Sequence, residues 1–364
     1  MLLKYFIEKV AVENVPKIEK KSCLHYKNDN DPCNNCLESC PTAAIVKKDQ
    51  ALVIKEELCI GCGICKVTCP SHSITMKHFG ENNIPKAIKN NETVVFGCNY
   101  GKSKGNVMVP CLNGLHPELL ALLILHFKEK KLIFNLSSCT ACSINSKALT
   151  FETSLKKALD FLKNIKSYTE PEVILNEEKL PDMNPASITR RDLFNIIKEG
   201  SVNQATEMVS SVWGNSVDNT LNHREKLLDL INGLMKEEKF EINPESNLFS
   251  NYVVNSKCNG CNYCHVICPY KAWEKEETQD TYTLSFNSGK CRSCGQCIRK
   301  CPQKAIERAK LFSDAFKGYI KKIEKPRIKC KKCNSRFVLT EKDNELCSTC
   351  KKREELRRSL FKKN

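Results

Sequence analysis

Cysteine is the residue type in this sequence that is able to do chemistry, with 24 copies in a chain of 364 residues. Most of them stand in groups with two residues between neighbouring cysteines, and thiolates at that spacing bind zinc or iron–sulfur clusters. A disulfide framework is the other use of so many cysteines, but such frameworks are typical of small secreted domains. The spacing therefore indicates a metal-loaded protein.

Neither a signal peptide nor a membrane span is predicted. Charges at Lys4, Glu8, Lys9 and Glu13 interrupt the apolar core that a signal peptide needs. The longest apolar run covers residues 119–125, which is far too short to cross a membrane as a helix. We therefore expect a soluble cytoplasmic metalloprotein.

One repeat occurs in four degenerate copies. Each copy ends in Cys-Pro and has a hydrophobic residue four places after the proline, at Ile45, Ile74, Trp273 and Ile306. The copies form two pairs, near residues 23–75 and 258–307, separated by about half the chain. Paired repeats of this kind predict two related modules.

The second pair consists of two complete C-x2-C-x2-C-x3-C-P runs, which begin at Cys258 and Cys291. This spacing resembles that of the bacterial ferredoxins with two [4Fe–4S] clusters, in which the fourth cysteine of each run reaches the other cluster. The resemblance implies two ligand sets, namely Cys258, Cys261, Cys264 and Cys301 for one cluster and Cys291, Cys294, Cys297 and Cys268 for the other. A pair of zinc sites is the alternative, but zinc knuckles come as separated C-x2-C pairs rather than as runs of four.

One run of the first pair departs from this pattern. The complete run begins at Cys59, and the ligands implied for its cluster are Cys59, Cys62, Cys65 and Cys40. The other run has Asn30 where the first ligand is expected. If the intervening loop folds back, Cys23 replaces that ligand and completes the set of Cys23, Cys33, Cys36 and Cys69; otherwise the site holds a [3Fe–4S] cluster. We favour the first interpretation, because Cys23 is otherwise the only cysteine of the chain without a set.

Four more cysteines lie between the two pairs, and they follow apparent strands. Because strand ends in an α/β sheet converge at one edge, we expect Cys98, Cys111, Cys139 and Cys142 to meet there. The arrangement is distantly similar to the thioredoxin-like [2Fe–2S] ferredoxins and to the small delta subunit of hydrogenases that supply heterodisulfide reductase. Three hypotheses stay open for this site: a fifth iron–sulfur cluster, a zinc ion, or a redox-active dithiol of Cys139 and Cys142.

The last cysteines form two separated pairs, Cys330 with Cys333 and Cys347 with Cys350. Two C-x2-C knuckles joined by a hairpin resemble zinc ribbons, in which four thiolates hold one zinc ion. Residues 326–364 contain 13 Lys or Arg against 5 Asp or Glu, which indicates docking to nucleic acid or acidic protein, or a solvated surface. Few aromatic residues interleave with these charges to stack on bases, so we favour the solvated surface.

The intervening sequence predicts the elements that position these cysteines. Apolar runs at 93–96, 107–109 and 131–134 alternate with helical patterns at 117–128 and 154–165, which is typical of a small α/β domain. Residues 186–240 show three amphipathic helical patterns. We therefore predict an α+β multidomain chain, with a ferredoxin-like module of two [4Fe–4S] clusters at 1–88, a small α/β domain at 89–180, a linker and helices at 181–248, a second ferredoxin-like module at 249–312, a zinc ribbon at 326–352 and a basic tail at 353–364.

The formal net charge of +16 counts every cysteine as neutral. If all 24 are thiolates in six metal sites, each site carries about −2 and the net charge falls to roughly +4. The overall basic balance is therefore weak evidence for a nucleic-acid partner.

The motifs predict an electron-transfer protein or redox-complex subunit that relays single electrons between protein partners through four [4Fe–4S] clusters. Two alternatives remain: an oxidoreductase that acts at the central cysteines, and an iron–sulfur regulator that contacts nucleic acid through the zinc ribbon. No flavin, nucleotide or pterin motif is readable, and none of the seven histidines falls in a catalytic pattern. These observations favour electron transfer and leave the donor and the acceptor open.

Overall fold

The computed structural model describes residues 15–27, 33–76, 88, 92–144, 151–165, 168–181, 222–234, 240–243, 246–340 and 345–361. The chain is a mixed α/β protein that divides into two compact units, Met1–Leu230 and Ile231–Asn364. None of the helices in the described ranges is long and apolar enough to cross a membrane. Two of the three amphipathic helices expected within 186–240 lie outside the described residues, and the third is α9 (Asn222–Leu234).

The first ferredoxin-like module is built from two short antiparallel ladders and two short helices. Strand β1 (Lys17–Ile18) pairs with β4 (Ile74–Thr75), and β2 (Ile45–Lys48) pairs with β3 (Ala51–Ile54). Between them lie α2 (Asn35–Glu38) and α3 (Ile64–Thr68). The apolar residues of the repeat, Ile45 and Ile74, begin β2 and β4 and are buried, so the repeat marks where each Cys-Pro loop enters the core.

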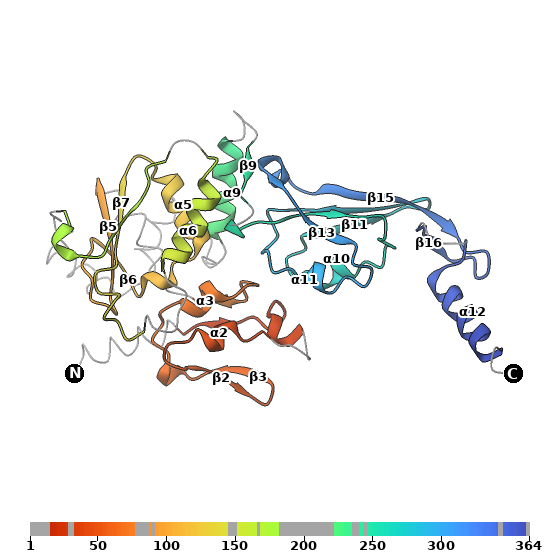
Figure 1. Ribbon diagram of the computed structural model, residues 1–364, viewed down its shortest axis with the longest axis horizontal. Helices are drawn as coiled ribbons and strands as arrows, with labels where there is room; N and C mark the ends of the chain where they lie inside the picture. The colour runs from red at the N-terminus through yellow and green to blue at the C-terminus, as the bar shows by residue number, and fades with distance from the viewer. Residues whose placement is uncertain are drawn as a thin grey trace, which may run out of the picture. The chain divides into compact units, whose positions relative to one another are not determined.

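The second module repeats this arrangement (Figure 1). Strand β10 (Asn251–Val254) pairs with β13 (Ile306–Ala309), β11 (Trp273–Glu277) pairs with β12 (Thr281–Phe286), and the two helices are α10 (Tyr263–Ile267) and α11 (Gln296–Arg299). Trp273 and Ile306, the apolar residues of these two repeats, again begin strands and are buried. The helices are short because each follows closely spaced cysteines and ends before a Cys-Pro pair, where the proline cannot continue a helix.

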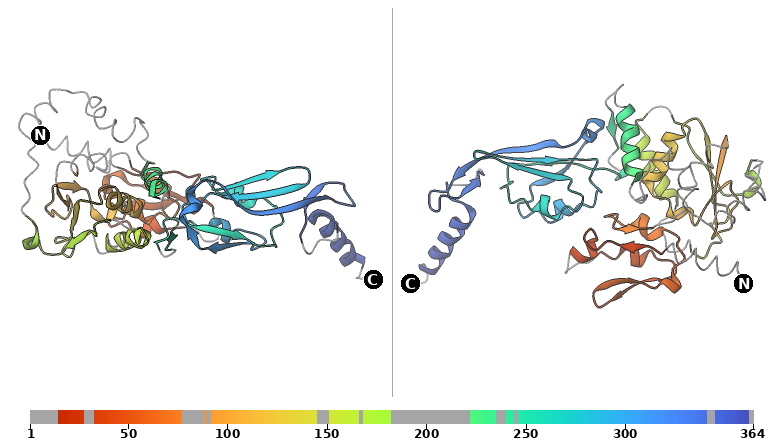
Figure 2. Two further views of the ribbon diagram at one scale, coloured as in Figure 1. Left: turned by 90° about the horizontal axis from the view of Figure 1, so that it is seen from above. Right: turned by 180° about the vertical axis from the view of Figure 1, so that it is seen from behind.

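A long strand joins the second module to the carboxyl-terminal cysteines. Strand β15 (Ile320–Lys329) pairs with β12 along one part and with β16 (Arg336–Val338) along the other, which gives a four-stranded sheet in the order β11-β12-β15-β16 (Figure 1 and Figure 2). Val338 packs into the same core as Trp273 and Tyr282. A side chain at Gly260 would lie 2.4 Å from Val338, so the close approach of β16 requires glycine there. The regions expected as a ferredoxin-like module at 249–312 and a zinc ribbon at 326–352 thus share one sheet.

The segment at 353–364, expected as a basic tail, is mostly helical. Helix α12 (Ser348–Phe361) runs through most of that segment. Its sequence is rich in Lys, Arg, Glu and Leu, all strong helix formers, which explains why a highly charged stretch is ordered as a helix. A smaller ladder joins β9 (Glu241–Ile242) to β14 (Leu311–Phe312) in the same unit.

The central domain is a parallel sheet beside two helices. Strands β5 (Thr93–Cys98), β6 (Val107–Val109), β7 (Lys131–Asn135) and β8 (Glu172–Ile174) lie in the order β6-β5-β7-β8. Helices α5 (Pro117–His126) and α6 (Phe151–Leu162) pack against one another beside the sheet (Figure 1). The expected strands are present, and the expected helices begin or end within three residues of those observed. Phe96 and Phe134 are fully buried in this domain, and their rings stack with centroids 4.8 Å apart.

Candidate metal centres

In the second module the structure brings Cys258, Cys261, Cys264 and Cys301 to one cavity with about 320 Å³ of empty volume. The other lining residues include Pro302, Ile306 and the ring of Tyr282, together with the polar Asn259, Asn262 and Gln303. Four thiols around one cavity, with apolar side chains among its walls, are the donor set and the shielding that a [4Fe–4S] cluster requires.

The second set of this module meets on the other side of the same core. Burial raises the pKa of Cys297, and the neighbouring thiols of Cys291, Cys294 and Cys268 raise it further. Three fully buried aromatic residues, Tyr252, Trp273 and Phe286, pack together next to these cysteines. An uncoordinated thiolate is costly in such surroundings, whereas a metal cluster takes up its charge.

The Cys-Pro loops share a hydrogen bond to sulfur. In three of them the backbone N–H four residues after the cysteine donates to its Sγ, from Ser73 to Cys69 at 3.3 Å, from Ala272 to Cys268 at 3.4 Å and from Ala305 to Cys301 at 3.3 Å. In these three loops the turn after the Cys-Pro pair thus aims a donor at the sulfur. Hydrogen bonds of this kind stabilise charge on a ligand sulfur and tune the potential of a bound cluster.

In the first module Cys40, Cys59, Cys62 and Cys65 line a cavity with about 340 Å³ of empty volume. Its walls include Pro41, Ile45 and Met76. Gly61 and Gly63 have positive φ angles, which allow the loop between Cys59 and Cys65 to wrap this cavity.

The irregular site of the first module includes Cys23. Cys23 packs in one buried cluster with Cys36 and Cys69. Burial raises the pKa of Cys36 to about 12, with further contributions from the thiols of Cys69, Cys23 and Cys33. The two ring nitrogens of His25 each lie 3.1 Å from a carbonyl oxygen, that of Cys33 and that of Gln50, and whichever nitrogen carries the proton donates to its carbonyl, which holds the segment of Cys23 against a neighbouring loop. The four cysteines of the expected set therefore lie together, while residues 28–32 between them are outside the described ranges.

The four central cysteines lie at the carboxyl edge of the parallel sheet. Cys98 ends β5, Cys111 follows β6 immediately before the short helix η3 (Leu112–Gly114), and Cys139 and Cys142 lie in the turns after β7. A hydrogen bond with the neighbouring Cys111 lowers the pKa of Cys98, and the N–H of Gly101 donates to the Cys98 sulfur at 3.3 Å. Burial raises the pKa of Cys139 to about 11, and the thiols of Cys98 and Cys142 add to this effect. The four residues thus form one cluster of thiols.

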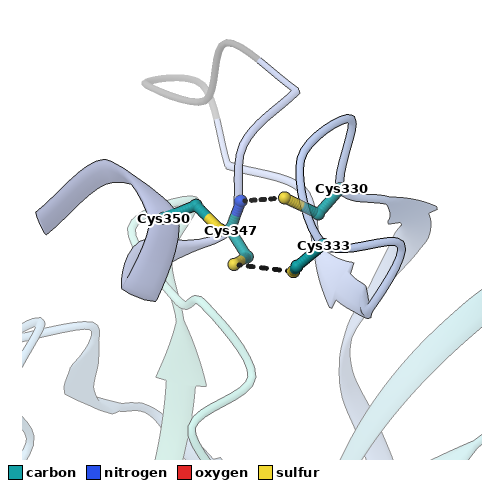
Figure 3. A group of neighbouring side chains, drawn as sticks. All are labelled: Cys330, Cys333, Cys347 and Cys350. Carbon is teal, nitrogen blue, oxygen red and sulfur yellow. Dashed lines mark hydrogen bonds between the residues drawn. The ribbon is translucent and has the colours of Figure 1, made fainter. Parts of the chain in front are cut away.

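The carboxyl-terminal cysteines also converge (Figure 3). The sulfur atoms of Cys330, Cys333, Cys347 and Cys350 all lie within 4.8 Å of one another, and those of Cys333 and Cys347 are 3.7 Å apart. A tetrahedral zinc ion with Zn–S bonds of about 2.3 Å needs sulfurs about 3.8 Å apart. The N–H of Cys347 donates to the Cys330 sulfur at 3.3 Å and lowers the pKa of Cys330, which favours a thiolate there. Cys330 and Cys333 lie between β15 and β16, and Cys350 lies in the first turn of α12.

Several residues near these sites have no recognisable sequence pattern. Tyr100 reaches from the central domain to the carbonyl oxygen of Ile60, and Lys325 of β15 reaches the carbonyl oxygen of Cys258. Glu118 at the start of α5 forms a buried ion pair with Arg224. Each contact joins residues more than 35 positions apart, so no local spacing predicts it.

Comparison with known proteins supports iron–sulfur binding in both modules. Residues 257–305 match the model of the 4Fe-4S dicluster domain, and residues 30–79 match the LdpA Fe-S cluster-binding domain. The chain is 45% identical over 42 residues to a ferredoxin of Methanocaldococcus jannaschii, 48% over 40 residues to hydrogenase-4 component A of Escherichia coli, and 35% over 66 residues to a tetrathionate reductase subunit of Archaeoglobus fulgidus.

These matches are short. They cover 12%, 11% and 18% of this chain, and 25%, 20% and 30% of the respective relatives. The likeness is therefore one of domains rather than of whole proteins. The chain carries two iron–sulfur cluster-binding domains and is similar, over short segments, to ferredoxins.

Proposed function

We propose that the protein is an iron–sulfur electron-transfer protein or redox-complex subunit that relays single electrons through four [4Fe–4S] clusters. The observation that carries this proposal is the convergence of sixteen cysteines into four groups of four, two of which line cavities. Paired clusters of this kind serve outer-sphere electron transfer and need no substrate pocket. Relatives named as a hydrogenase component and a tetrathionate reductase subunit support a role beside redox partners.

The ligand sets of the second module are Cys258, Cys261, Cys264 and Cys301, and Cys291, Cys294, Cys297 and Cys268. Those of the first module are Cys59, Cys62, Cys65 and Cys40, and Cys23, Cys33, Cys36 and Cys69. The burial of Cys23 with Cys36 and Cys69 supports a complete cubane at the irregular site rather than a [3Fe–4S] cluster.

The central cysteines hold a fifth iron–sulfur centre in this proposal. The thiols of Cys98, Cys111, Cys139 and Cys142 converge on one edge of the sheet, which suits a [2Fe–2S] or [4Fe–4S] cluster. The carboxyl-terminal site of Cys330, Cys333, Cys347 and Cys350 holds zinc, since its sulfurs have the spacing of a single tetrahedral ion. Zinc has no redox chemistry, so its role here is to stabilise the fold of β16 and α12.

Electrons exchange with partner proteins at the cluster of Cys258. Cys261 is exposed, unlike the largely buried cysteines of the first module. Tyr263 and Val266 of α10 stand beside it, three residues apart and therefore on one face, and Val266 is 75% exposed. A large apolar side chain left in water next to a redox centre is typical of a surface that docks a partner.

Metal analysis of anaerobically purified protein tests the proposal. Four [4Fe–4S] clusters predict about 16 irons per chain, a central [2Fe–2S] cluster raises this to about 18 and a central [4Fe–4S] cluster to about 20, with about one zinc in each case. Paramagnetic resonance after reduction with dithionite is expected to show signals of interacting [4Fe–4S] clusters. A colourless protein without acid-labile sulfide after anaerobic reconstitution would contradict the whole proposal.

Two matched variants test the irregular site. Cys33→Ser removes a ligand of a regular C-x2-C pair, and Cys23→Ser removes the ligand assigned outside the pattern. Both are expected to convert or lose the same cluster and to give the same loss of a four-iron signal. Full iron content in Cys23→Ser beside a loss in Cys33→Ser would show that Cys23 is not a ligand.

A further inference from the structure

Tyr100 links the first ferredoxin-like module to the central cysteines. It lies in the turn after β5, two residues beyond Cys98, and its phenol donates a hydrogen bond to the carbonyl oxygen of Ile60. Ile60 directly follows Cys59 in the loop that wraps the cavity of the first module. On the other side, the N–H of Gly101 donates to the Cys98 sulfur at 3.3 Å. A continuous path of covalent and hydrogen bonds therefore runs from the Cys59 sulfur to the Cys98 sulfur.

The two sites are also held together by packing within the same unit. Helix α3, which carries Cys65, packs against η3, which follows Cys111. The ring of His72 meets that of His116 edge to face, with centroids 4.6 Å apart. Beside them, Glu118 forms an ion pair with Arg224 at 2.8 Å, and both side chains are almost fully buried. Buried polar contacts of this kind fix one orientation, because any shift would leave them unsatisfied.

The Tyr100 phenol stands between the thiols of the two sites. A phenol ordinarily has a pKa of about 10, so it keeps its proton at neutral pH and is able to donate the hydrogen bond to Ile60.

We propose that the cluster of Cys40, Cys59, Cys62 and Cys65 exchanges electrons directly with the centre held by the four central cysteines, and that Tyr100 is the positioning contact of this exchange. The inference rests on the proposed function. It adds that these two centres exchange electrons directly and that Tyr100 lies between them. The central domain is then the electron-transfer partner of the first module within one unit.

The step moves one electron and no proton. Cys40, Cys59, Cys62 and Cys65 would hold the centre that supplies one electron and is thereby oxidised, and Cys98, Cys111, Cys139 and Cys142 would hold the centre that accepts it and is thereby reduced. The first electron comes from an external reductant, which is a photosensitiser in the test below. Tyr100 is neither oxidised nor reduced; its phenol and the following amide hold the two loops at bonding distance.

Flash photoreduction of the complete, cluster-loaded protein tests the contact. The central centre is first assigned by the absorbance and resonance signals that Cys139→Ser removes. Tyr100→Phe deletes the hydroxyl and keeps the ring, and it is expected to slow electron arrival at the central centre by about tenfold, which corresponds to about 1.4 kcal/mol. Metal content and equilibrium potentials should stay as in the unmodified protein. Tyr168→Phe makes the same chemical change shortly before β8, at the opposite edge of the parallel sheet, and is expected to leave the rate unchanged.

The outcomes separate this inference from the proposed function. An unchanged rate in Tyr100→Phe, or an equal slowing in Tyr168→Phe, overturns the role of Tyr100. If Cys139→Ser changes neither the iron content nor the spectra of a protein that still holds four [4Fe–4S] clusters, the inference is wrong. The proposal of a four-cluster relay is not affected by that result. A protein without clusters overturns both. Magnetic interaction between the reduced first-module and central signals, retained in Tyr100→Phe, would support the closeness of the two centres independently of the rate.

Discussion

A single lysine offers a quantitative test of the cluster site at Cys258. Lys325 lies on β15, and its ammonium donates to the carbonyl oxygens of Cys258, at 2.9 Å, and of Ser256. Burial raises the pKa of Cys258, and the positive charge of Lys325 opposes that rise. A charge that favours the thiolate also favours the extra electron of a reduced cluster. Lys325→Gln is therefore expected to lower the midpoint potential of this cluster.

The size of the effect follows from Coulomb's law. If the ammonium lies about 7 Å from the added charge, their interaction is about 2.4 kcal/mol at an effective dielectric constant of about 20 and about 0.6 kcal/mol at that of water. Lys325 is half-buried, so the interaction lies between these limits. One elementary charge changes its energy by about 2.3 kcal/mol per 100 mV. The midpoint potential of the cluster is therefore expected to fall by about 25 to 100 mV. Because salt screens exposed charges, the fall should become smaller at high ionic strength.

Potentiometric titration followed by paramagnetic resonance measures this shift. Lys321→Gln is the matched control, since it removes the same charge from the same strand, where the exposed Lys321 pairs with Glu324 at 3.0 Å. We expect one cluster to move in Lys325→Gln and none to move by more than about 10 mV in Lys321→Gln, because exposed charges are well screened. Equal shifts in both variants would show that net charge, rather than the contact with the Cys258 loop, sets the potential.

Three further predictions concern stability. Removal of zinc by a chelator, at constant iron content, is expected to unfold residues 330–350 and to speed their proteolysis, because thiolate ligands form such a site only with the metal bound. Glu118→Gln leaves the buried Arg224 guanidinium without its carboxylate, so it should lower the free energy of unfolding by about 3–5 kcal/mol in denaturant titrations. The control is Asp160→Asn, which breaks the surface ion pair with Lys156 and should change the free energy of unfolding by less than about 0.5 kcal/mol. Burial lowers the pKa of His116, so the unfolded chain takes up a proton that the folded chain does not, and stability falls as the pH drops below about 6.5. His116→Asn keeps an acceptor for the N–H of Glu118 and should flatten the decline of Tm between about pH 7 and 5; an unchanged slope would exclude His116 as its cause.

The parts of the fold that follow from local sequence were predictable. The hydrophobic residue after each Cys-Pro pair, such as Ile74 or Ile306, begins a strand because the proline ends the preceding helix and the apolar side chain enters the core. The strands of the central domain are short apolar runs, and a parallel sheet buries such runs on both faces. The convergence of Cys98, Cys111 and Cys139 at one edge follows from that topology.

The remaining features depend on contacts between distant residues. The pairing of β15 with β12 brings Pro326 beside Thr281, and no periodicity marks which of several possible strands will be the partner. Tyr100 is separated from Ile60 by 40 positions, and a lone tyrosine between Asn99 and Gly101 has no pattern that distinguishes it from a surface residue. Cys23 is intermediate: counting cysteines predicted its role, but its place beside Cys36 depends on the fold of the whole module.

The two modules share a motif but differ in their exposure to water, and this difference assigns them different roles in the proposed relay. Five of the eight cysteines of the first module are buried, against one of the eight in the second. Outer-sphere transfer requires close approach, so in the proposed relay the more deeply buried first module would exchange electrons within its own unit, and the cluster beside the exposed Cys261 would be accessible to a separate protein. Burial and hydrogen bonding also shift cluster potentials, so identical cysteine spacing does not imply identical potentials. In this proposal the repeat specifies how clusters are bound, and the residues around each loop decide with which partner each cluster exchanges electrons.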